Sequence, residues 1–219
     1  MAELTSVDAH AEQAGTKSPQ ERRRRILEST VEMVRERGFA GTRVVDIARH
    51  AGTSAGLVLY HFQSLQGALS EALTAAENAF YDELDEALGA AEGPVARLRL
   101  MGELAARSGS AVGDWTLWLE LWARALRDPD ARLTRESLDQ RWRAALRAVI
   151  DEGVASGDFS TPDPAATTMR LASLMDGLAI QLALVDPQVS DDGFRDLWLG
   201  AASLELAAEL TGRAGPGLP

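Results

Sequence analysis

Four tryptophans in the second half of the chain are the side chains best suited to recognising a cation. Trp115, Trp118 and Trp122 recur at intervals of three and four residues, which places them on one face of a helix, and Trp142 lies on the apolar face of a later helix. The face of an indole ring attracts cations. Two interpretations stay open for these residues: they pack in the core of a helical domain, or they form the wall of a pocket for a cationic or amphipathic small molecule.

Other side chains complete this candidate pocket. Phe80, Met101 and Met175 are adaptable apolar wall residues. Asp176 interrupts the apolar run LASLMDGLAIQLALV, so its carboxylate is expected to pair within the pocket or across a dimer seam, or to lie on the helix surface. The net charge of −11 also favours a cationic effector.

Near the N-terminus the sign of the charge is reversed. Residues 17–70 contain nine basic and five acidic side chains, although the chain as a whole is strongly acidic. Such an asymmetry suggests two functions in one chain. The basic block is either a solvated, arginine-rich helix face or a surface that neutralises nucleic-acid phosphates.

Residues 38–69 have the spacing of a helix-turn-helix. Ala48 is small enough to let two short helices cross closely, and Gly52, four residues later, tolerates the positive φ of the turn. Ser54 can cap the second helix, whose N-terminal end and outer face would enter the major groove of DNA. The predicted DNA-binding residues are the start of the first helix of the pair and the outer surface of the second: Thr42, Arg43, Ser54, Ala55, Gly56, Leu57, Tyr60 and His61.

The second helix of this pair is unusually apolar. Residues 54–59 contain no Arg, Lys, Asn or Gln that could make a bidentate contact with a base. Base recognition is therefore expected to use thymine methyl groups, Tyr60 or His61, Arg43, and DNA shape. Because one short helix contacts few bases, specificity requires two half-sites and hence a homodimer.

Two alternatives compete with the DNA-binding interpretation. Residues 52–56 match G-x-S-x-G, the nucleophile elbow of serine hydrolases, with His61 nearby. That chemistry needs a strand entering the turn and a distant histidine, whereas here a helix is expected to enter and His61 is only seven residues from Ser54. The other alternative is an acidic helical module that binds only protein. It differs from a DNA binder because phosphate binding weakens steeply with salt.

The elements that position these residues are helices. Hydrophobic periodicity predicts an all-α fold of about nine helices. We expect a three-helix helix-turn-helix domain over residues 18–64. The candidate pocket and the dimer contacts are assigned to a larger ligand-binding and dimerisation domain over residues 65–211. Residues 1–17 are expected to be a disordered N-terminal tail and residues 212–219 a flexible tail.

We predict no catalytic residue, metal or cofactor, since cysteine is absent and histidine is rare. With neither a signal peptide nor an apolar run of about 18 residues, we expect a cytoplasmic protein without membrane contact.

The stretch from Gly38 to Ser64, G-F-x-G-T-x-x-x-D-I-A-x-x-A-G-x-S-x-G-x-x-x-Y-H-F-x-S, resembles the tetracycline-repressor (TetR) family of transcriptional regulators. The stretch from Trp115 to Pro129, W-x-x-W-x-x-x-W-A-x-A-L-R-D-P, resembles the choline-repressor-type branch. The resemblance implies a homodimeric repressor that a small molecule releases from a palindromic operator, with a dimer seam formed by the last two helices. In two departures, Leu65 stands where the family usually has a phosphate-binding lysine, and Leu59 where it often has tyrosine.

Overall fold

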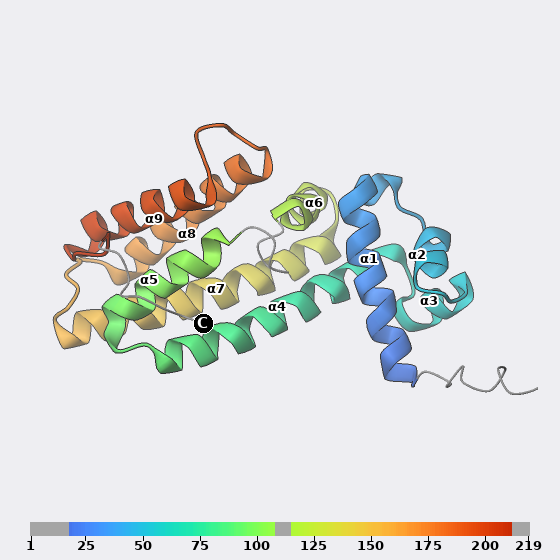
Figure 1. Ribbon diagram of the computed structural model, residues 1–219, viewed down its shortest axis with the longest axis horizontal. Helices are drawn as coiled ribbons and strands as arrows, with labels where there is room; N and C mark the ends of the chain where they lie inside the picture. The colour runs from blue at the N-terminus through green and yellow to red at the C-terminus, as the bar shows by residue number, and fades with distance from the viewer. Residues whose placement is uncertain (1–17, 108–114, 212–219) are drawn as a thin grey trace, which may run out of the picture. The chain divides into compact units, whose positions relative to one another are not determined.

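The computed structural model describes residues 18–107 and 115–211, and the regular structure in these ranges is entirely helical, with nine helices (Figure 1). The predicted tails at residues 1–17 and 212–219 lie outside the described residues. Contacts divide the chain into two compact units, Met1–Leu69 and Ser70–Pro219. None of the helices in the described ranges is long and apolar enough to cross a membrane.

The first unit contains α1 (Pro19–Gly41), α2 (Val44–His50), α3 (Ala55–Phe62) and the beginning of α4 (Leu65–Ala90). The Ser18 hydroxyl caps α1 by accepting a hydrogen bond from the Glu21 N–H at 3.1 Å. The sequence predicts that this helix stops at Gly38, and the backbone does leave helical geometry there, with φ 68° and ψ 166°. The first helical segment therefore stops at Gly38 as predicted, and α1 joins it to one more helical turn across a bend at that residue.

The crossing of α2 and α3 has the predicted geometry. Ala48 on α2 is only 3% exposed, and Gly52 in the turn has a φ of 65°. The Thr53 N–H donates to the Ala48 carbonyl at 2.8 Å, which closes the turn after α2. The apolar residues that hold α1, α2 and α3 together are Ile26, Met33, Val34, Ile47, Val58 and Phe62.

The second unit continues α4 and adds α5 (Gly93–Ala106), α6 (Trp115–Ala125), α7 (Pro129–Ser156), α8 (Pro164–Ala183) and α9 (Asp191–Leu206). The long helix α7 packs against α5, α6 and α8, and α9 packs against α5 and α8 (Figure 1). The large side chains buried at the centre of these contacts include Leu98, Leu121, Leu146, Ile150, Phe194 and Trp198.

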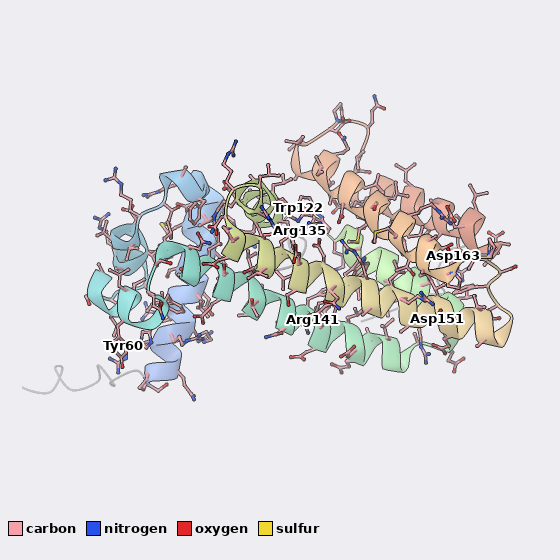
Figure 2. All side chains as sticks on the ribbon, turned by 180° about the vertical axis from the view of Figure 1, so that it is seen from behind. Tyr60, Trp122, Arg135, Arg141, Asp151 and Asp163 are labelled. Carbon is pink, nitrogen blue, oxygen red and sulfur yellow. The ribbon has the colours of Figure 1, made fainter. Side chains whose placement is uncertain are left out.

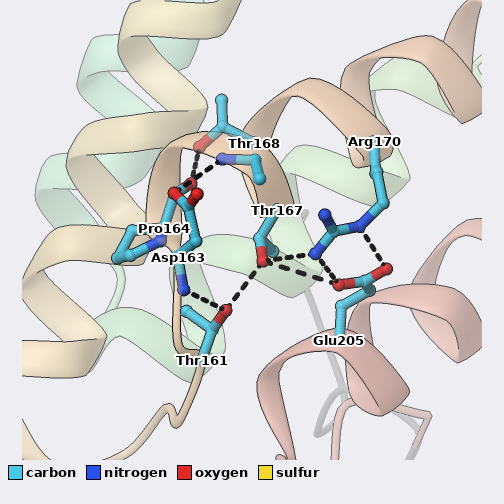
Figure 3. A network of polar contacts seen from close by, with 8 residues as sticks. Thr161, Asp163, Pro164, Thr167, Thr168, Arg170 and Glu205 are labelled. Carbon is cyan, nitrogen blue, oxygen red and sulfur yellow. Dashed lines mark hydrogen bonds and ion pairs between the residues drawn. The ribbon is translucent and has the colours of Figure 1, made fainter.

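A polar network fastens the start of α8 to the end of α9 (Figure 3). The Arg170 Nε donates to Glu205 at 2.6 Å, and its Nη2 donates to the Thr167 hydroxyl at 3.1 Å. Thr167 is fully buried, and its hydroxyl also contacts the Thr161 hydroxyl at 2.8 Å. Because the buried Thr167 hydroxyl has hydrogen-bond partners, the network joins the two helices without leaving that polar atom unsatisfied.

Two helix ends differ from those predicted. The last helix, expected to reach residue 211, ends at Leu206 because Ala207 adopts a left-handed conformation with φ 48°. The helix before it, α8, was expected to reach Val185 but ends at Ala183, and Val185 has a φ of 57°. In both cases the chain leaves helical geometry at a non-glycine residue, whose type does not mark the exact position of the stop.

Candidate functional site

The outer surface of α3 presents the residues predicted for DNA recognition. The Ser54 hydroxyl caps the helix by accepting a hydrogen bond from the Leu57 N–H at 3.2 Å. Gly56 is exposed, and Tyr60 is 81% exposed and points away from the helix (Figure 2). The half-exposed ring of His61 lies edge-on to that of Tyr60, with centroids 5.4 Å apart.

The structure separates the two residues predicted to meet a phosphate before α2. Arg43 is exposed at the N-cap of α2. Thr42, in contrast, is only 4% exposed, and its hydroxyl donates to the carbonyl oxygens of Gly38 at 2.8 Å and Met33 at 3.1 Å. Its N–H donates to Phe39 at 3.2 Å. Thr42 therefore stabilises the bend in α1 and offers no group to a phosphate, which corrects its place in the predicted set.

Arg25 of α1 is a cation that the residue spacing of the sequence does not distinguish. Its Nη2 lies 3.5 Å from the position that a Cβ on Gly52 would occupy, so the guanidinium group reaches the turn between α2 and α3. In the described part of the chain it makes no ion pair, whereas Arg24 pairs with Glu28 at 2.7 Å. No periodicity distinguishes Arg25 from its three arginine neighbours, and only the folded chain shows which of them reaches the turn.

The second unit contains a cavity, partly open to solvent, with about 40 Å³ of room for the centre of a water molecule. Aromatic side chains from α4, α6 and α7 form most of its wall: Phe80, Tyr81, Trp115, Trp118, Trp122 and Trp142. Five of these six were predicted from the sequence as pocket residues, and Tyr81 was not. The rings are inclined to one another, at 53° for Trp118 and Trp122 and 40° for Phe80 and Trp142. They therefore form the walls of a box rather than a flat stack.

Helix α8 closes the cavity with Met175 and Asp176, both predicted. Met101, also predicted, is fully buried and is not among the lining residues, where α5 contributes Ala105 instead. Asp139 and Arg143 on α7 also line the cavity, and neither was predicted from the sequence. A signal for Asp139 was present, since it lies three residues before Trp142 and so shares its helix face.

The acidic groups of the cavity are partly buried. The Asp139 carboxylate is paired with Arg135 at 2.6 Å and with Arg143 at 3.3 Å. Burial raises the pKa of the Asp139 carboxyl, and these two arginines oppose the rise. Burial, with the nearby negative charge of Asp139, raises the pKa of Asp176 to about 6. The lining therefore contains two carboxyl groups and one cation, the guanidinium group of Arg143, and Asp176 is ionised at neutral pH.

Both units match known family models. Residues 26–81 match the model described as bacterial regulatory proteins, tetR family, and residues 94–203 match the BetI-type transcriptional repressor, C-terminal model. The chain is a TetR-family transcriptional repressor of the BetI type. Members of the TetR family bind operator DNA as dimers and respond to small-molecule effectors. The family resemblance found in the sequence is thus confirmed.

Individual relatives support the same assignment. The repressor is 26% identical over 193 residues to the HTH-type transcriptional regulator BetI of Stenotrophomonas maltophilia, which covers 85% of this chain and 94% of the relative. It is 29% identical over 176 residues to BetI 2 of Chromohalobacter salexigens, covering 74% and 78% of the two chains. A solved structure of a putative transcriptional regulator from Saccharomonospora viridis in complex with choline is 29% identical, with a TM-score of 0.79 over 85% of this chain and 98% of that one.

The two alternative functions find no support. The turn at residues 52–56 is entered by the helix α2 rather than by a strand, and the hydroxyl of Ser54 caps α3. A nucleophile elbow requires a strand before the turn. The match of residues 94–203 to the BetI-type repressor model leaves the protein-binding module without support.

Proposed function

We propose that the effector of this repressor is a quaternary ammonium cation of the choline class, bound in the aromatic cavity of the second unit. The observation that carries the proposal is the lining itself, in which four tryptophans lie with Asp139 and Asp176 around one space. A relative at 29% identity was solved in complex with choline, which supports the same ligand class.

The chemistry of a quaternary ammonium group explains why this lining suits it. Such a cation has no N–H to donate, so a protein recognises it through aromatic faces and nearby negative charge rather than through directed hydrogen bonds. The chain already uses this interaction at the cavity wall, where the Arg141 guanidinium carbon lies 4.1 Å from the centroid of the Tyr81 ring. Trp115 has a structural role as well, because its ring stacks on Phe194 of α9.

The first unit supplies the operator contacts in this proposal. Tyr60 and the apolar side chains of Ala55 and Leu57 approach base edges and thymine methyl groups, and Arg43 meets the phosphate backbone. Arg25, at the turn before α3, adds a phosphate contact that offsets the missing lysine at Leu65. A repressor that binds chromosomal DNA in this way acts in the cytoplasm.

Effector binding releases the operator by favouring a dimer state in which the two recognition helices no longer match successive major grooves, about 34 Å apart. Helix α4 is the element suited to transmit this change, because it begins within the first unit and supplies Phe80 and Tyr81 to the cavity. Crystals with and without effector that show the same separation of the α3 helices would overturn this mechanism.

The binding proposal is tested by calorimetry on the full-length protein. Choline is compared with 3,3-dimethyl-1-butanol, which has the same shape without the charge. We expect the neutral compound to bind at least about tenfold more weakly, since it loses the cation–π attraction. Trp118→Leu should weaken choline binding by a similar factor, whereas Trp198→Phe, which removes an indole outside the cavity, should not. Equal binding of the two compounds would refute the proposal.

A further inference from the structure

Three of the tryptophans around the cavity have an unsatisfied hydrogen-bond donor. The indole nitrogens of Trp115, Trp122 and Trp142 are buried and have no hydrogen-bond partner within residues 18–107 and 115–211. The side chains of Trp115 and Trp142 are only 6% and 7% exposed. The core tryptophan Trp198 behaves differently, because its indole N–H donates to the Leu171 carbonyl at 2.9 Å.

These donors indicate that the bound molecule carries an acceptor. Leaving a buried N–H without a partner is costly, and three such groups around one space are unusual in a native protein. An indole N–H can only donate, and a quaternary ammonium group can neither accept nor donate a hydrogen bond. The aromatic faces therefore account for the cationic part of an effector, and the indole N–H groups suit a second part that contains oxygen acceptors.

A groove adjoins the cavity and shares Trp122 and Asp176 with it. Two cations line this groove, Arg132 and Arg135 of α7, and Figure 2 shows Arg135 next to Trp122. The Nε of Arg132 donates to the Ala125 carbonyl at 3.3 Å, while its terminal nitrogens make no hydrogen bond to the rest of the described chain. The guanidinium group is therefore held at one end and available at the other.

The charges of the combined lining are balanced but separated. The cavity carries Asp139, Asp176 and one cation, Arg143, whereas the groove adds Arg132 and Arg135 and one further carboxylate, Glu136. Asp176 lines both spaces and lies at their junction. The cavity lining has one carboxyl more than cations, and beyond the junction Arg132 and Arg135 outnumber Glu136. A ligand that matches both ends carries a cation at one end and an anion at the other.

We propose that the effector site takes a zwitterionic quaternary ammonium compound. Its trimethylammonium group lies among the tryptophans, and its carboxylate or phosphate accepts hydrogen bonds from the indole N–H groups and from Arg132 at the groove. This inference rests on the proposed function for the cationic half of the ligand and adds the anionic half. Choline itself, with a hydroxyl in place of the anion, fills only part of the site.

The test compares choline, glycine betaine and phosphocholine by calorimetry with the full-length repressor. Of the two zwitterions, phosphocholine has the longer chain between its ammonium group and its anion. We expect phosphocholine to bind at least about tenfold more tightly than choline, since a hydrogen bond to a charged group is worth about that factor or more. Arg132→Gln should reduce this advantage to within about twofold and leave choline binding unchanged. The matched control Arg127→Gln alters an exposed arginine outside both linings and should preserve the advantage.

A second variant separates the indole N–H from the indole ring. Trp142→Phe keeps an aromatic face but removes the donor, so it should weaken phosphocholine several-fold more than choline. Choline binding as tight as or tighter than that of phosphocholine, or an advantage that survives both Arg132→Gln and Trp142→Phe, would overturn the inference alone. Failure of choline and both zwitterions to bind would overturn the proposed function as well.

Discussion

Asp139 on α7 and Asp176 on α8 line the same cavity, and the charge of Asp139 adds to burial in raising the pKa of Asp176 to about 6. Arg143 and Arg135, both on α7, act in the opposite direction. The Asp139 carboxylate is held by these two arginines, whereas Asp176 has no ion pair within the described ranges. One of the two carboxyl groups that face the proposed cation therefore changes its charge just below neutral pH.

Effector affinity should consequently fall as the pH is lowered. Asp176 is ionised at pH 7.5 and mostly neutral at pH 5.5, so the dissociation constant for choline should rise about threefold to fivefold between these values. Calorimetry at both pH values measures the change. In Asp176→Asn the affinity should be low at pH 7.5 and nearly independent of pH. A wild-type dissociation constant that stays constant over this range would contradict the assignment of Asp176 to the cation site.

The same carboxyl group should destabilise the folded protein at neutral pH. Its pKa is higher in the folded than in the unfolded chain, so the folded state binds the proton more tightly and stability declines as the pH rises from about 4 to 6. Asp176→Asn should raise the free energy of unfolding at pH 7 by about 1–2 kcal/mol, allowing for partial solvent screening, and by almost nothing below pH 4. Thermal melts at the two pH values check this. Asp151→Asn, on the exposed part of α7, serves as control, and a less stable Asp176→Asn protein at pH 7 would disprove the expectation.

How far the sequence predicted this molecule depended on whether the signal was local. Ala48 and Gly52 were predicted correctly because a close helix crossing and a positive φ each restrict the residue type at one position. Thr42 was placed wrongly because its partners, the carbonyl groups of Met33 and Gly38, become available only through the bend in α1. Nothing in the spacing of residues around Thr42 reveals that bend.

The cavity shows the same division. The tryptophans on α6 were grouped correctly because they share a helix face, which periodicity reveals. Two other features depend on how α5, α7 and α8 pack together. Asp139 and Asp176 line one cavity, and Met101 lies in the core rather than in the cavity wall. Sequence periodicity gives the buried face of each helix but not which neighbour that face meets.

Operator binding should depend on Arg43 and Tyr60 through different physical effects. Arg43→Ala removes one phosphate contact, so it should weaken binding to all sequences and reduce the slope of log affinity against log salt by about one. Tyr60→Ala should lower operator affinity with little change in that slope. Fluorescence anisotropy over a salt series distinguishes the two, with size-exclusion chromatography to show that the dimer is intact. Arg127→Ala, an exposed arginine in the second unit, is the matched control and should change neither quantity. An unaltered salt slope in Arg43→Ala would remove Arg43 from the interface.

The dimer should be sensitive to the exposed apolar surface of α9. Leu204 is 87% exposed in the single chain, and Leu197, two turns earlier on the same helix, is 53% exposed. Leu204→Glu should therefore shift the protein to a monomer at micromolar concentration, because a carboxylate cannot be buried at an apolar seam without a partner. Analytical ultracentrifugation measures the shift. Leu133→Glu changes an exposed leucine on α7 and should leave the dimer unaffected; a dimeric Leu204→Glu protein would place the seam elsewhere.

The central claim, that a quaternary ammonium ligand in the aromatic cavity controls operator binding, is tested most directly by titrating the repressor–DNA complex with effector. The DNA is the fragment upstream of the repressor's own coding region, and the measurement is fluorescence anisotropy with choline and with phosphocholine. We predict that saturating ligand weakens DNA binding at least about tenfold in the wild-type protein. Trp118→Leu should bind the DNA equally well and fail to release it. Unchanged DNA affinity in the wild-type protein, at concentrations where calorimetry shows the cavity to be occupied, would contradict the account.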